Sequence, residues 1–145
     1  NLSSKDMLNM VNKESGLAGI SGVSSDMREI TAAAKQGNEK AILSLEMYEQ
    51  RITKYVGAFA AEMGGVDIIV FTGGVGEHQS STRANVCNPL RFMGVEIDDA
   101  ANDANNGDEG IISTPNSAVK VVVIPTDEEY MIAKDTEAII EGREP

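Results

Sequence analysis

Cysteine and long apolar runs are scarce in this chain, and each absence excludes a class of protein. Cys87 is the only cysteine among 145 residues, so no internal disulfide can form, as is typical of proteins from a reducing cytoplasm. No apolar run approaches the length of about 18 residues that a membrane-spanning helix needs. The first residues carry no signal-peptide pattern. We therefore expect a cytoplasmic protein that does not cross a membrane.

Basic residues are also few, with 12 Lys and Arg against 23 Asp and Glu and a net charge of −11. This charge argues against a nucleic-acid backbone or an anionic membrane as the main partner, because both are themselves densely negative. It does not exclude a nucleotide, which needs only a local pocket of hydrogen-bond donors and a metal ion.

The side chains of the common hydrolytic and metal sites are missing. One cysteine and one histidine, His78, are too few for a zinc site. No candidate Ser/His/Asp set is present, and Cys87 has no directly flanking Lys, Arg or His to activate its thiol. Because His78 has no visible catalytic partner, we expect it to lie beside a ligand rather than to act as a general base.

The hydrophobic pattern predicts a single α/β unit, with helices first and strands mainly in the second half. A content of 41% hydrophobic residues is enough for a real core. Helices are expected at 3–12, 26–36, 39–63, 81–87 and 128–141, and strands at 68–71, 95–97, 111–113 and 118–124. The glycine-rich segment 14–25 is expected to be an ordered loop, with room for a short strand at 17–20.

Two of the expected helices carry apolar residues at helical spacing. In the helix 39–63 we expect one wide buried stripe, with a partner-binding face as the alternative. It comprises Ile42, Leu45, Tyr48, Ile52, Tyr55, Val56 and Phe59. In the last helix we expect an inward face of Met131, Ile132, Ala138 and Ile139.

The most informative segment is 66–78, in which an apolar run meets Gly73, Gly74 and Gly76. The residues 68–71 suit a strand buried on both faces of a sheet. Glycines past the carboxyl end of such a strand allow close approach of a ligand, and a helix start there suits an anion or a nucleotide. The spacing is neither a full dinucleotide fingerprint nor a Walker loop. A tight turn without a ligand is the alternative interpretation.

Two further segments carry charged side chains beside expected helix starts. Arg28 could hold a phosphate or stack on a base, and Asp26 could bind ribose, but a dipole-compensating acid and a solvated charge are the simpler interpretation. The acids Asp127, Glu128 and Glu129 follow a strand, where a carboxylate is well placed to hold Mg²⁺. Acids that only offset the helix dipole are again the alternative.

Taken together, three segments closely resemble acetate kinase, in the order and spacing of that family. They are 19–28 (GISGVSSDMR), 66–77 (VDIIVFTGGVGE) and 123–129 (VIPTDEE). The sequence between these segments also resembles the family, so that the resemblance covers nearly the whole chain. The resemblance implies the actin/hexokinase/Hsp70-like fold, in which ribonuclease-H-like domains enclose a nucleotide. It also implies Mg²⁺-dependent phosphoryl transfer between ATP and acetate, giving acetyl phosphate and ADP.

The resemblance also assigns expected roles to individual residues. Asp26, Met27 and Arg28 would line the adenosine side of the pocket, and Glu128 would help to position Mg²⁺. The loop over the base and phosphates would consist of Gly74, Val75, Gly76, Glu77 and His78. His78 stands where the family usually has Asn, although an imidazole can still donate one hydrogen bond.

The matched part is the last third of an acetate kinase. We therefore expect residues 1–145 to be the carboxy-terminal, nucleotide-binding portion, with the amino-terminal domain and the catalytic residues upstream of Asn1, and no phosphoryl transfer by this chain alone. The family implies a homodimer. A propionate or other short-chain carboxylate kinase is one alternative, and a non-catalytic nucleotide-binding or dimerisation fragment is another.

Overall fold

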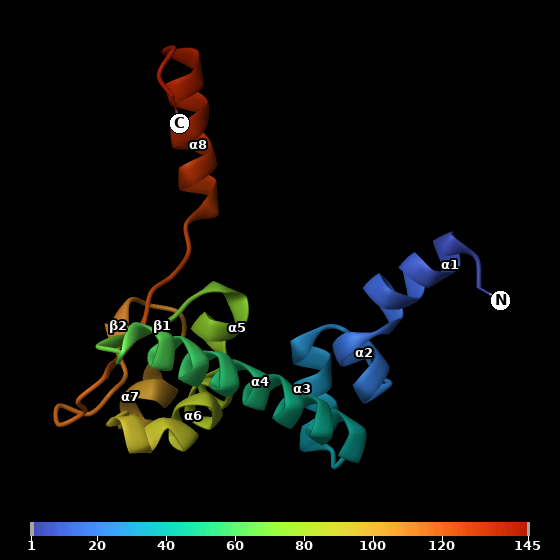
Figure 1. Cartoon of the computed structure of the whole chain (residues 1–145), viewed down its shortest axis with the longest axis horizontal. Helices are drawn as coiled ribbons and strands as arrows, with labels where there is room; N and C mark the ends of the chain where they lie inside the picture. The colour runs from blue at the N-terminus through green and yellow to red at the C-terminus, as the bar shows by residue number, and fades with distance from the viewer. Residues whose placement is uncertain (1, 145) are drawn as a thin grey trace.

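The computed structural model, which describes residues 2–144, contains a three-stranded sheet in the order β1-β3-β2, at the opposite end of the molecule from the amino-terminal helices (Figure 1). β1 (Ile68–Phe71) runs parallel to β3 (Lys120–Val123), and β2 (Gly110–Ile111) runs antiparallel to β3. These strands confirm the predictions for 68–71 and for the pair at 111–113 and 118–124. The predicted strand at 95–97 is reduced to isolated bridges from its two end residues.

One face of this sheet is buried and the other is not. Ile69 and Phe71 are buried in a cluster with Val121 and Val123, onto which α4 and α6 pack. On the other face Ile68 is 52% exposed and Val70 is 49% exposed. The prediction of a strand buried on both faces is therefore wrong for the described residues, because their helices cover only one face.

The longest helix, α4 (Glu39–Met63), has the predicted ends. Asn38 caps it by accepting the Ala41 N–H at 3.1 Å, and Gly64 ends it with a φ of 76°. The predicted buried stripe is only partly correct. Its residues at 45, 48, 52 and 56 are half-buried, but Ile42, Tyr55 and Phe59 are exposed, whereas Ala41, Ser44, Glu49 and Ala60 are buried. α2 and α3 pack on the first part of α4 (Figure 1), and the core cluster covers the side that carries Ile52 and Val56. The exposed side chains lie on faces of α4 that no described element covers.

The amino-terminal part is helical where a loop was expected. α1 (Ser4–Asn9) begins with a capping box formed by Ser3 and Asp6. The π-helix η1 (Met10–Glu14), α2 (Gly16–Ser21) and α3 (Met27–Lys35) follow it. The expected loop at 14–25 and its optional strand are wrong, because Gly16 and Gly22 bound α2 and Gly19 lies inside the helix without ending it. Gly16 and Gly22 have φ of 62° and 64°.

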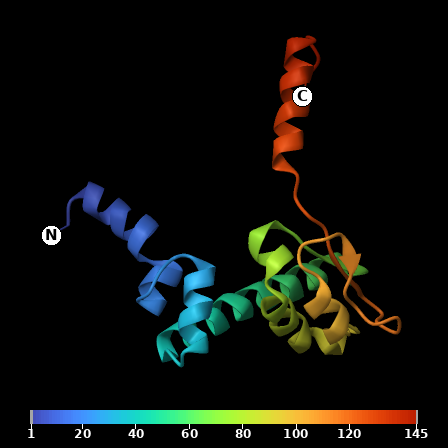
Figure 2. The same cartoon turned by 180° about the vertical axis from the view of Figure 1, so that it is seen from behind.

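The remaining helices follow β1 in the chain. The first of them comprises residues 73–78, which are called the glycine segment below. In chain order, the elements between β1 and β2 are α5 (Gly73–His78), α6 (Ser80–Cys87), the 3₁₀ helix η2 (Asn88–Met93) and α7 (Asp99–Ala104). α8 (Glu128–Ile140) projects away from the sheet on a short linker, as Figures 1 and 2 both show. Its predicted inward face is therefore wrong except at Ala138: Met131, Ile132 and Ile139 are 48%, 67% and 64% exposed.

Glu49 joins α4 to α6. Its carboxylate accepts hydrogen bonds from Thr82 Oγ1 at 3.2 Å and from Asn85 Nδ2 at 2.9 Å. Burial raises the pKa of Glu49, while these two hydrogen bonds oppose the rise and Glu46 adds to it. A raised pKa in the folded state means that protonation of Glu49 stabilises folding. This stabilisation is fully present below the unfolded pKa and is lost as pH rises through the folded pKa.

Glu49→Gln is therefore expected to remove this loss of stability. As pH rises from 4.5, the free energy of unfolding of the variant should increase relative to that of the wild type, because the amide cannot ionise. Urea denaturation across the pH range measures the difference, with Glu62→Gln, at an exposed position near the other end of α4, as the control. Parallel pH profiles for wild type and Glu49→Gln would show that Glu49 does not set this dependence.

Candidate functional site

The glycine segment forms a short helix directly after β1. Thr72 precedes it in an extended conformation, and Gly73 opens it with a φ of 69°, which side chains rarely adopt. Gly76 lies against Phe71, where an added Cβ would come within 3.3 Å of the Phe71 carbonyl carbon. The expected turn before a helix is thus itself helical, and its glycines allow both the start of the turn and its close packing on β1.

The glycine segment borders a groove that faces α4. This hollow of about 420 Å³ is lined by Tyr48, Ile52 and Val56 of α4 and by residues 69–76. An added Cβ at Gly74 would meet no atom within 4 Å. The groove therefore has room for a ligand against the backbone of the glycine segment, at the carboxyl end of a parallel strand.

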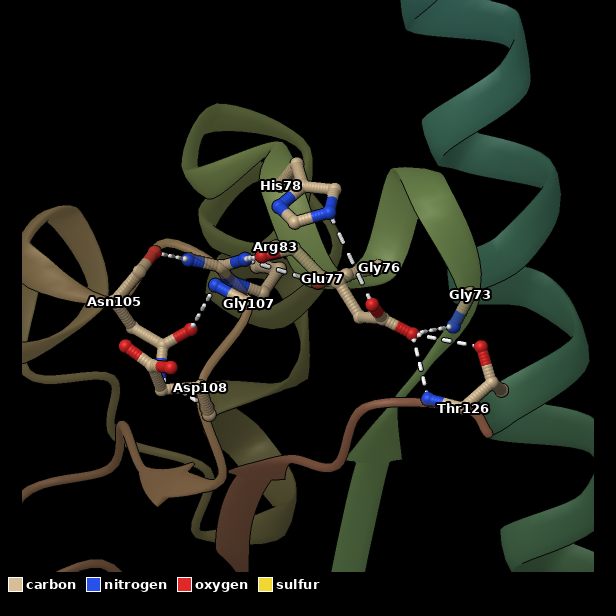
Figure 3. A network of polar contacts seen from close by, with 9 residues as sticks. All are labelled: Gly73, Gly76, Glu77, His78, Arg83, Asn105, Gly107, Asp108 and Thr126. Carbon is tan, nitrogen blue, oxygen red and sulfur yellow. Dashed lines mark hydrogen bonds and ion pairs between the residues drawn. The ribbon is translucent and has the colours of Figure 1, made fainter. Parts of the chain in front are cut away.

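Glu77 is buried, and its carboxylate points toward Gly73 and Thr126 (Figure 3). Its Oε1 accepts hydrogen bonds from the Gly73 N–H at 2.7 Å, from the Thr126 N–H at 2.9 Å and from Thr126 Oγ1 at 3.1 Å. The hydrogen bond from the Thr126 N–H is the main cause that lowers the pKa of Glu77. Oε1 is therefore fully engaged within the protein, whereas the described residues donate no hydrogen bond to Oε2.

Arg83 is the main residue of the site that the sequence analysis missed. It lies on α6 and is completely buried, yet it contacts no carboxylate. Its guanidinium donates to the carbonyls of Gly76 at 2.9 Å and Glu77 at 2.7 Å (Figure 3). It also donates to Asn102 Oδ1 at 2.7 Å, the Asn102 carbonyl at 2.8 Å and the Asn105 carbonyl at 3.0 Å. One side chain thus fixes the end of the glycine segment to α7 and to the turn that follows it.

His78 ends the glycine segment with its side chain 55% exposed. Its ring packs on Gly107, where an added Cβ would overlap the imidazole, and its Nε2 lies 3.9 Å from Glu77 Oε2. Figure 3 shows the ring beside the turn that contains Asn105 and Gly107. This placement leaves His78 accessible beside the segment, with the Glu77 carboxylate as a charged neighbour.

Asp26 and Arg28 pair with each other. Asp26 caps α3 by accepting the Arg28 N–H at 2.8 Å, and its Oδ2 accepts from Arg28 Nη2 at 2.6 Å. The hydrogen bond from the Arg28 side chain lowers the pKa of Asp26 to about 2. Arg28 is 86% exposed, whereas Met27 is buried. α3 and α5 lie along different stretches of α4 (Figures 1 and 2), so these residues do not touch the glycine segment in the described chain.

Glu128 lies in the first turn of α8. Its neighbour Asp127 caps that helix by accepting the Tyr130 N–H at 2.9 Å. Within residues 2–144 no three His, Cys, Asp or Glu side chains gather as a metal site. A Mg²⁺ ion commonly takes only one or two protein carboxylates and completes its shell with phosphates and water. The exposed Glu128 carboxylate could supply one such ligand, but the described residues around it do not form a complete protein-only metal site.

Neither the Cys87 thiol nor the described helices indicate a further kind of site. Burial raises the pKa of the Cys87 thiol to about 12, which agrees with the prediction that Cys87 is not a nucleophile. Among the described residues, no helix combines the length and the hydropathy that a bilayer crossing requires.

Comparison with known families identifies the group to which the chain is related. Residues 1–134 match the Acetokinase family. The chain belongs to this family. It is 59% identical to the acetate kinase of Porphyromonas gingivalis over 131 residues, which are 90% of this chain and 33% of that protein. It is 58% identical to the acetate kinase of Bacteroides thetaiotaomicron over 139 residues, 96% of this chain and 35% of that protein.

Solved acetokinase structures share this fold. The crystal structure of the Porphyromonas gingivalis acetate kinase superposes with a TM-score of 0.87 at 55% identity, over 96% of this chain and 35% of that one. A propionate kinase from Francisella tularensis superposes with a TM-score of 0.81 at 37% identity, over 92% of this chain and 34% of that one. The predicted fold class, a partial ribonuclease-H-like domain of the acetate and sugar kinase superfamily, is confirmed. The acetokinase chain described here spans about a third of the length of these relatives.

Proposed function

We propose that this chain is the nucleotide-binding part of an acetate kinase, which transfers a phosphoryl group between ATP and acetate. The observation that carries the proposal is the groove beside Gly74, at the carboxyl end of β1, in a chain whose acetokinase relatives are named for this activity. In this family context the simpler interpretation of the glycine segment as a turn without a ligand becomes the weaker one.

Each site residue has a proposed part in binding. The backbone of Gly74, Val75 and Gly76 would lie against the nucleotide, since the two glycines have no Cβ to hold a ligand away. His78 would donate a hydrogen bond from the exposed edge of the segment. Arg28, fixed by Asp26, would hold the adenosine side, and Met27 would support them from its buried position.

The chemistry would depend on positioning and charge neutralisation. A Mg²⁺ ion held by Glu128 would neutralise phosphate charge in the transition state. The residues that act on acetate would come from outside these 145 residues, so the chain alone would not transfer phosphate. We further propose that the whole enzyme is a cytoplasmic homodimer.

A propionate kinase is the second candidate, because one structure of high similarity carries that name. The residues that would contact the acyl group are proposed to lie outside these 145 residues, so the two substrates have to be compared by experiment. The non-catalytic fragment remains the alternative of a different class, and it predicts that the chain supports no activity in any context.

A domain replacement tests the proposal. The third of the Porphyromonas gingivalis acetate kinase that aligns with this chain is replaced by residues 1–145, and acetyl phosphate formation from ATP is assayed with acetate and with propionate. We expect activity from the chimera and none from the isolated chain. The matched control is the same chimera carrying Glu128→Gln, which should lose most of its turnover. A folded chimera that transfers no phosphate to either acid would contradict the proposal.

A further inference from the structure

The linker between β3 and α8 is tied to the body of the protein at two points. The Ile124 N–H donates to the Phe71 carbonyl at 2.9 Å, and Thr126 donates to Glu77 through both its N–H and its hydroxyl. Beyond Thr126, no hydrogen bond joins the described part of α8 to the rest of the protein. Thr126 is thus the last hydrogen-bonded anchor before the arm that carries Glu128.

The acceptor at this anchor also belongs to the glycine segment. Glu77 Oε1 receives the Gly73 N–H at 2.7 Å from one side and the two Thr126 groups at 2.9 and 3.1 Å from the other. Figure 3 shows these donors converging on the one oxygen. Hydrogen bonds to an ionised carboxylate are stronger than neutral ones. A shift of Gly73 therefore changes the acceptor on which the start of α8 depends.

We propose that Glu77 is a positioning residue that couples the glycine segment to the start of α8. A nucleotide bound against Gly74 and Gly76 fixes Glu77, and Glu77 in turn fixes Thr126 and the two acids that follow it. The proposal rests on the proposed nucleotide site. It assigns to the Glu77 side chain a role between two parts of that site, in place of a contact with the ligand.

Amide hydrogen exchange of the 145-residue chain, with and without Mg-ADP, tests this coupling. In the wild type, Mg-ADP should slow exchange both in residues 73–78 and in residues 126–129. In Glu77→Gln and in Thr126→Val, protection of 126–129 should be reduced while that of 73–78 is kept, because both changes weaken this contact although the Thr126 N–H can still donate to residue 77. Thr126→Ser keeps the hydroxyl and should behave as the wild type does, which makes it the matched control for Thr126→Val.

Binding affinity supplies the second readout. Thr126→Val, outside the glycine segment, should weaken Mg-ADP binding by about threefold to tenfold, because it removes one hydrogen bond to a charged acceptor. Adding Glu77→Gln should cause less than the product of the two separate losses, because both changes break the same contact. If Glu77→Gln does not fold, Thr126→Val and Thr126→Ser carry the test alone.

Three results would overturn the proposal, and they are distinguishable. Protection of 73–78 without protection of 126–129 in the wild type would show that the segments are independent. Equal protection of 126–129 in wild type and in a folded Glu77→Gln or Thr126→Val variant would show that Glu77 does not carry the coupling. No protection of either segment in a folded chain would overturn the nucleotide site itself, and the coupling with it.

Discussion

Arg83→Leu is expected to lower the free energy of unfolding by about 3–5 kcal/mol and to abolish Mg-ADP binding. Arg83 is fully buried. Its guanidinium donates to the side-chain oxygen and the backbone carbonyl of Asn102, and to the carbonyls of Gly76, Glu77 and Asn105. Leucine fills much of the space but donates nothing. The variant therefore leaves several buried oxygens without a partner, and such a group costs far more than a lost contact at the surface.

Chemical denaturation measures the stability of this variant, and calorimetry measures binding. Arg91→Leu is the matched control, because Arg91 is exposed and makes a single hydrogen bond to Asn88 at 3.2 Å. Arg83→Lys keeps the charge but cannot reproduce the fork of the guanidinium, so its stability should be intermediate. If Arg83→Leu unfolds at the same denaturant concentration as the wild type, the network does not hold the glycine segment.

Gly74→Leu is expected to fold normally and to bind Mg-ADP at least about tenfold more weakly, a loss of about 1.4 kcal/mol in binding free energy. A Cβ at Gly74 would meet nothing within 4 Å, and Gly74 does not have the positive φ of Gly73, so the side chain should enter the groove without strain. Leucine also favours helices over glycine. Stability should therefore be unchanged or slightly higher while the space beside the backbone is lost.

Gly57→Leu is the matched control for this change. Gly57 lies in α4, an added Cβ there also meets nothing within 4 Å, and it borders a different hollow. Thermal unfolding and calorimetry of both variants separate an effect on folding from an effect on binding. Unchanged affinity in Gly74→Leu would place the ligand elsewhere and leave the glycine segment as a turn.

Local patterns were sufficient for the elements that bring the glycine segment into place. The apolar run before Gly73 predicted β1, and the helix expected at 39–63 has the bounds of α4. The glycines of 14–25 led to the prediction of a loop where α2 forms. Glycine is unfavourable inside a helix but favourable at its ends, where a positive φ is needed. The expected loop at 14–25 failed for this reason.

Burial was harder to predict than secondary structure. The exposed Ile68 and Val70 of β1 and the exposed Ile132 and Ile139 of α8 carry an apolar pattern that nothing in the described residues covers. An apolar pattern indicates that a side chain favours burial, but it does not say which element provides the cover.

The polar contacts of the site depend on residues far apart in the chain. Glu77 and Thr126 are 49 residues apart, and Arg83 and Asn102 are 19 apart, so no local motif connects them. A signal for Arg83 was nevertheless present. It precedes Val86 and Cys87 by three and four residues on α6, and this spacing places it on the apolar face of the helix. An arginine on such a face has to find acceptors inside the protein.

Calorimetric titration of the folded 145-residue chain with Mg-ADP tests the central claim most directly. The account predicts saturable binding at one site per chain, weakened at least about tenfold in Gly74→Leu and also weakened in Arg28→Ala. Binding by the wild type that both variants leave unchanged would contradict the assigned site. No binding by a chain shown to be folded by circular dichroism would contradict the claim that these residues assemble a nucleotide site.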